Sequence, residues 1–76
     1  MSHPDAALLR EIIELEHSIA DAWDDLDLLK ELKERCGSAT RPAACRKAIQ
    51  KRIDHKIARI ARLQKRRDDI RRQLGE

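Results

Sequence analysis

Residues 34–45, with the sequence ERCGSATRPAAC, decide the fold of this 76-residue chain. Gly37 can adopt the left-handed conformation that closes a helix, and Thr40 can cap a second helix that has Pro42 in its first turn. The other glycine and the other proline stand near the chain ends, so no further residue of these two types interrupts a helix. This segment therefore predicts a tight turn at residues 37–40.

Two long helices are expected on either side of this turn. The first covers about residues 3–36, and Ser2 and Asp5 at its start have the spacing of a capping box. The second covers about residues 41–74. Charged residues make up 41% of the chain and aromatic residues 1%, which is typical of long helices and coiled coils rather than of folds that contain sheets.

The apolar residues of both helices repeat with alternating steps of four and three, which is the heptad period of a coiled coil. The first stripe is Leu8, Ile12, Leu15, Ile19, Ala22, Leu26, Leu29 and Cys36, interrupted by Lys33; the second is Ile49, Ile53, Ile60, Leu63, Ile70 and Leu74, with Lys56 and Arg67 in its two gaps. Folding the chain about the turn places residues opposite each other when their numbers add up to 81 or 82. The sequence thus predicts an all-α fold, an antiparallel, coiled-coil-like two-helix hairpin that forms one domain over residues 1–76.

Six large apolar residues lie beside the two stripes, where a hairpin of two helices cannot bury them: Leu9, Ile13, Trp23, Leu28, Leu32 and Ile57. An apolar face that is wider than one seam indicates a second seam. These residues are therefore the predicted interface, and we expect two hairpins to pair as a homodimeric four-helix bundle. A bundle with a larger protein partner is the alternative.

Charge is divided between the two halves of the chain. Residues 1–40 hold four Lys or Arg and ten Asp or Glu, a net charge of −6, and residues 41–76 hold thirteen and four, a net charge of +9. Oppositely charged helices favour each other in the fold-back register. The predicted ion pairs are Glu11 with Arg71, Glu16 with Arg66, Asp24 with Arg59, Glu31 with Lys51 and Glu34 with Lys47.

A cluster of cations near the C-terminus stays mainly uncompensated, even with the pairs predicted for Arg66 and Arg71: Lys65, Arg66, Arg67, Arg71 and Arg72. Such a cluster could contact phosphates, so a nucleic-acid-binding accessory protein is one alternative function. The basic half contains no aromatic side chain that could stack on bases apart from the histidine ring, and the chain contains no helix-turn-helix or zinc-finger spacing. A solvated basic face is the simpler interpretation.

Cys36 and Cys45 lie opposite each other across the predicted turn. Two reduced thiols packed at the tip, a disulfide, and a thiolate metal site completed by a second subunit are the three alternatives. Cys36 and Cys45, separated by eight residues, are similar to the metal-sensing loop of MerR-family regulators, and the stretch from Cys45 to Leu74 resembles their dimerisation helix. This resemblance implies a thiol-based metal or redox sensor as a further alternative function.

The remaining features exclude several classes of protein. No apolar stretch approaches the length of a membrane span, and the N-terminus does not resemble a secretory signal, so we expect a cytoplasmic protein without a membrane contact. No catalytic constellation or cofactor motif is present. The sequence therefore predicts a non-enzymatic protein–protein interaction module, a small accessory or regulatory protein that needs no cofactor.

Overall fold

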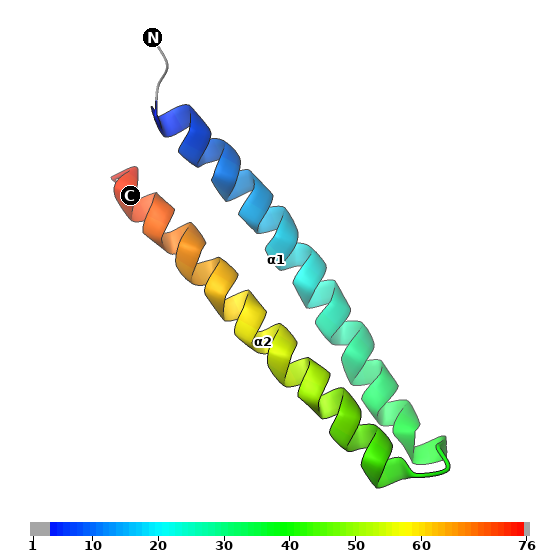
Figure 1. The fold of residues 1–76 in the computed structure, drawn as a ribbon. Helices are drawn as coiled ribbons and strands as arrows, with labels where there is room; N and C mark the ends of the chain where they lie inside the picture. Colours follow the sequence, from blue (N-terminus) through cyan, green and yellow to red (C-terminus); the bar gives the residue numbers. More distant parts are fainter. Residues whose placement is uncertain (1–3, 76) are drawn as a thin grey trace.

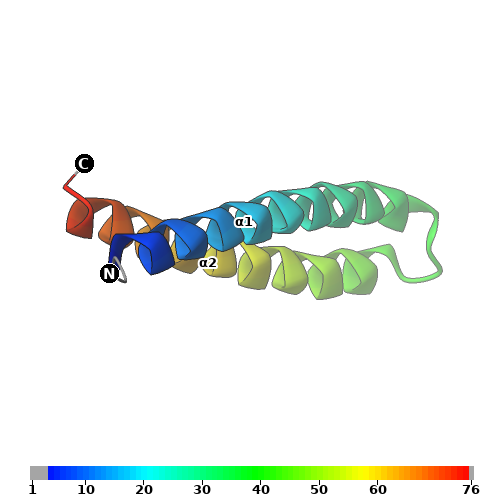
Figure 2. The same ribbon diagram turned by 90° about the horizontal axis from the view of Figure 1, so that it is seen from above.

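Two helices of equal length form the computed structural model, which describes residues 4–75. Helix α1 covers Pro4–Arg35, a short 3₁₀ turn η1 covers Cys36–Ser38, and helix α2 covers Pro42–Gln73. The helices run side by side in opposite directions and make a rod of 62 × 15 × 14 Å (Figures 1 and 2). Residues 4–75 contain no strand. The predicted all-α fold with two packed helices is confirmed, and the observed ends at Arg35, Pro42 and Gln73 lie within one residue of the predicted ones. The predicted cap at Ser2 lies outside the described residues.

The seam between α1 and α2 is built from the predicted heptad stripes. Among the described residues, seven apolar ones are buried, and every one of them belongs to a stripe: Ile19, Ala22, Leu26, Cys36, Ile53, Ile60 and Ile70. Ala22, Leu26, Ile53 and Ile60 form the central cluster, against which Leu29 and Ile49 pack. Burial of these side chains stabilises two helices that would be marginal alone in water.

The tip of the hairpin differs from the prediction in two details. Gly37 continues the 3₁₀ turn instead of taking a left-handed conformation, and the glycine with a positive φ, 87°, is Gly75 at the far end of α2. Thr40 is not the cap of α2, because Arg41 holds that position without a side-chain hydrogen bond. Pro42 stands in the first turn as expected, where its missing N–H leaves no helical hydrogen bond unmade.

Ion pairs link the flanks of the two helices, but the predicted partners are exchanged. Arg66 Nε lies 2.9 Å from Glu11 Oε1, and an Arg71 Nη atom lies 2.8 Å from Glu16 Oε1. The prediction matched residues by their level along the rod and ignored the flank. Glu11 and Arg66 both stand at g positions of the heptad, and Glu16 and Arg71 both stand at e positions. Reversing one helix places g beside g and e beside e, so only these combinations share a flank.

The other three predicted pairs do not form within the described part of the chain, where no ion pair joins Asp24 to Arg59, Glu31 to Lys51 or Glu34 to Lys47. An exposed pair of long side chains gains little from a fixed geometry in water. By contrast, the hydrogen bond from Arg66 to Glu11 and the charge of that carboxylate raise the pKa of the Arg66 guanidinium above its ordinary value. The charge asymmetry of the helices is therefore used at a few positions rather than along the whole seam.

Polar residues within the stripes reach out of the seam. Lys56 Nζ lies 3.3 Å from Asp25 Oδ2, and Lys33 donates a hydrogen bond to Gln50 on the opposite helix. Arg67 Nε lies 3.3 Å from its neighbour Asp68. Long cationic side chains can cover a seam with their methylene groups while their charged ends stay near water. None of the side chains described here is a buried polar group without a hydrogen-bond partner.

Candidate functional site

The six residues predicted as an interface are the large apolar side chains that stand exposed in the part of the hairpin that the structure describes. Their exposed fractions are 52% for Leu9, 57% for Ile13, 44% for Trp23, 59% for Leu28, 46% for Leu32 and 50% for Ile57. They lie on two sides of the rod. Trp23 and Leu28 are five residues apart, which separates them by about 140° around the helix at about 100° per residue.

The first side is an apolar flank, defined here as Leu9, Ile13, Trp23 and Ile57. Leu9, Ile13 and Trp23 lie on one side of α1, because their directions fall within about 80° of each other at about 100° per residue. Ile57 of α2 stands at an e position, as Trp23 does. The disulfide and the Lys56–Asp25 pair both join residues whose numbers add up to 81, so Trp23 and Ile57 lie at nearly the same level of the rod.

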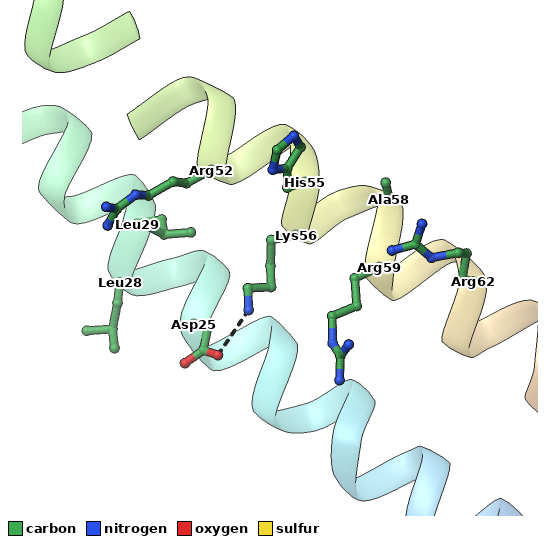
Figure 3. Close-up of a pocket in the computed structure, with 9 residues that line it drawn as sticks. All are labelled: Asp25, Leu28, Leu29, Arg52, His55, Lys56, Ala58, Arg59 and Arg62. Atoms are coloured by element: carbon green, nitrogen blue, oxygen red, sulfur yellow. Dashed lines mark hydrogen bonds and ion pairs between the residues drawn. The ribbon is translucent and has the colours of Figure 1, made fainter. Parts of the chain in front are cut away.

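The second side carries an open groove between the two helices, with a volume of about 780 Å³. Helix α1 contributes Asp25, Leu28 and Leu29, and helix α2 contributes Arg52, His55, Lys56, Ala58, Arg59 and Arg62. The side chains of Arg52, Lys56 and Arg59 extend from α2 toward α1 (Figure 3). Leucine side chains therefore form an apolar floor, with cations beside it.

Sequence reasoning did not single out the arginines of this groove as a site. Arg52 and Arg59 are seven residues apart, and so are His55 and Arg62. Spacing of one heptad keeps each pair on one side of the helix. This heptad repeat of basic residues could have indicated the groove from the sequence, but the denser basic cluster near the C-terminus drew the prediction to that region instead.

The C-terminal cluster proposed as a phosphate site is mostly paired with carboxylates. Arg66 and Arg71 contact α1, as described, while Arg67 contacts Asp68 and Arg72 contacts Asp69 at 2.7 Å. The expectation of an uncompensated patch is therefore wrong for four of its five residues, and Lys65 is the fifth. Carboxylates within contact distance weaken the attraction of these arginines for phosphate.

The two cysteines form a disulfide, which is one of the three alternatives for them. The Cα atoms of Cys36 and Cys45 lie 5.6 Å apart, a separation that a disulfide requires and that two packed helices do not normally allow. The approach is close because Cys36 belongs to the 3₁₀ turn η1 and not to α1. While this bond is intact, neither sulfur is a thiolate ligand. Within residues 4–75, no group of three or more His, Cys, Asp or Glu side chains could hold a metal ion.

Comparison of the chain with protein-family models, with curated proteins and with solved structures gives no match. Neither α1 nor α2 has an apolar run long enough to cross a lipid bilayer. The two sides of the rod are therefore the candidate functional surfaces.

Proposed function

We propose that this chain is a non-enzymatic protein–protein interaction module in which two hairpins pair through the apolar flank to make a four-helix bundle. One observation carries the proposal: the large apolar side chains of this flank, which the hairpin does not bury, are 44% to 57% exposed. Trp23 is the largest of them, and tryptophan is enriched among the residues that dominate binding energy at interfaces.

The surface area of the hairpin supports a partner. A compact monomer of 8.8 kDa exposes about 4,800 Å², whereas the hairpin exposes 6020 Å². The excess, about 1,200 Å², is comparable with the roughly 800 Å² that each partner buries in a standard interface. A rod of two helices has too little interior for its length, and pairing two rods supplies that interior.

Charge complementarity favours a second copy as the occupant of the apolar flank. Helix α1 has a net charge of −6 and α2 a net charge of +9, counted over the residues of each helix. A two-fold axis can set α1 of each copy beside α2 of the other, so every new helix contact joins opposite charges. The same pairing places apolar residues of one flank on those of the other.

Sedimentation velocity of matched double variants tests this proposal. Wild-type protein should sediment as a species of twice the monomer mass, and the variant Trp23→Ser/Ile57→Ser should sediment as a monomer. The control, Leu28→Ser/Leu32→Ser, removes two equally exposed apolar residues from the other side and should remain dimeric. Circular dichroism checks that both variants stay helical. A wild-type monomer across a hundredfold range of concentration, or dissociation of the control alone, would contradict the proposal.

A further inference from the structure

The groove on the second side of the rod contains three arginines that have no carboxylate partner. Arg52, Arg59 and Arg62 form no ion pair with any described residue, whereas Lys56 in the same groove is paired with Asp25. Helix α2 has a larger net positive charge than α1 can neutralise, +9 against −6. Part of that surplus is therefore concentrated where the groove opens to solvent.

The floor of the groove is apolar. Leu28 is 59% exposed and Leu29 is half-buried, and both line the groove from α1, while Ala58 lines it from α2. Figure 3 shows the two leucines on α1, with Arg52, Lys56 and Arg59 extending from α2 toward that helix. A ligand that gains from both features must present apolar and anionic groups side by side.

We infer that this groove binds an acidic amphipathic helix of a partner protein, whose apolar side chains cover Leu28 and Leu29 and whose carboxylates pair with Arg52, Arg59 and Arg62. The inference rests on the proposed function as an interaction module, and it assigns the partner's chemistry on a side of the rod that the apolar flank does not use. Guanidinium groups bind carboxylates through two parallel hydrogen bonds, and amphipathic helices dock in grooves of this kind.

Helix spacing supports this ligand. Arg52 and Arg59 are one heptad apart, about 10 Å along α2, so carboxylates repeated every seven residues on a neighbouring helix meet them in register. The hairpin already contains such a contact, since acidic α1 packs along basic α2. The partner helix would lie against the same basic helix on its next face and extend the bundle by one helix.

A nucleic acid fits the groove less well. Phosphates would use the three arginines, but they would leave Leu28 in contact with water or with charged oxygens. The groove contains no Phe, Tyr or Trp to stack on a base, and stacking on such rings supplies much of the affinity for single strands. Nucleic acid is therefore kept as an outcome that the experiment can detect.

Fluorescence anisotropy with a labelled designed peptide tests the inference. The probe is an amphipathic helix with leucines at heptad spacing and glutamates on both flanks, and the controls are a scrambled peptide and one with lysine in place of glutamate. We expect saturable binding of the probe that weakens as salt rises, and at least about tenfold weaker binding of both control peptides.

Two charge-reversed variants locate the site. Arg59→Glu/Arg62→Glu should weaken binding at least about tenfold, and Lys47→Glu/Lys51→Glu, which makes the same charge change outside the groove, should weaken it less than about threefold. Equal weakening by both variants, or tighter binding of duplex DNA than of the probe, would overturn the inference. So would loss of the dimer in the arginine variant, because a second copy would then occupy the groove. Peptide binding by Trp23→Ser/Ile57→Ser separates this inference from the proposed dimer, since a monomer should bind the peptide unchanged.

Discussion

Replacing both cysteines by serine should remove a large part of the stability of the hairpin. Cys36 and Cys45 are nine positions apart, so the cross-link closes a loop of ten residues. The loss of chain entropy in an unfolded loop of that length corresponds to about 2.7 kcal/mol. A single core of this size rarely supplies more than about 3 to 5 kcal/mol, which makes the disulfide comparable with the whole apolar seam.

Urea unfolding followed by circular dichroism at one fixed protein concentration measures this effect. With a slope of about 1 kcal/mol per molar urea for a small domain, the midpoint should fall by between about 2 and 3 M in Cys36→Ser/Cys45→Ser. Wild-type protein treated with a reductant should fall by a similar amount, because it loses the same cross-link. Ala43→Ser/Ala44→Ser is the matched control, since it adds two hydroxyls to exposed positions of the same segment and should leave the midpoint nearly unchanged.

Two results would refute this reasoning. The first is a wild-type midpoint that is the same with and without reductant, which would mean that the cross-link does not constrain the unfolded chain. The second is a titration that finds two free thiols in protein purified without reductant. In that case the close approach of Cys36 and Cys45 would be a packing contact, and the stability would come from the seam alone.

Three further predictions concern the packing of the rod and the conformation of its turns. Leu26→Ala should cost about 2 to 5 kcal/mol because that side chain is 1% exposed, whereas Leu32→Ala, at 46% exposure, should cost less than about 1 kcal/mol; urea midpoints measure both. Lys56→Met should raise the melting temperature, because a cation within the seam is replaced by an apolar side chain of similar length, and a lower melting temperature would show that its ion pair outweighs its desolvation. Gly37→Ala should stabilise the chain by about 0.4 to 1 kcal/mol, since an added Cβ meets only the end of an arginine side chain at 3.8 Å, while Gly75→Ala should not, because the φ there is 87°.

Periodicity explains why the seam could be predicted from the sequence. Each buried residue of the rod, Leu26 and Ile60 among them, belongs to a heptad stripe, and a repeat sustained over many turns has only one face that can be buried. The same argument identified the six apolar residues that the seam leaves exposed. The sequence pattern does not predict what these six residues contact, because it shows that an apolar face is exposed but does not specify the partner that covers it.

The features that the sequence did not predict have local physical causes. Glu11 was matched to the wrong arginine because level along the rod was used without the flank, and flank depends on the reversed direction of the second helix. The state of Cys36 and Cys45 stayed open because a Cys36 that continued α1 would lie too far from Cys45 for a disulfide, whereas a 3₁₀ turn brings it to 5.6 Å from Cys45. Turn geometry depends on a few dihedral angles that no periodic pattern encodes.

The placement of the cross-link also determines how the rod responds to mechanical force. Helix α1 begins and α2 ends at the same end of the rod, and the disulfide closes the opposite end (Figure 1). Tension between the start of α1 and the end of α2 therefore separates the two helices progressively from that end of the rod. A few side-chain contacts break at a time, and the whole seam is not sheared at once. Opening stops at Cys36 and Cys45, after the released chain has extended by roughly 200 Å. The disulfide keeps the two chain segments in register, so the hairpin can close again along the same seam when the tension is removed.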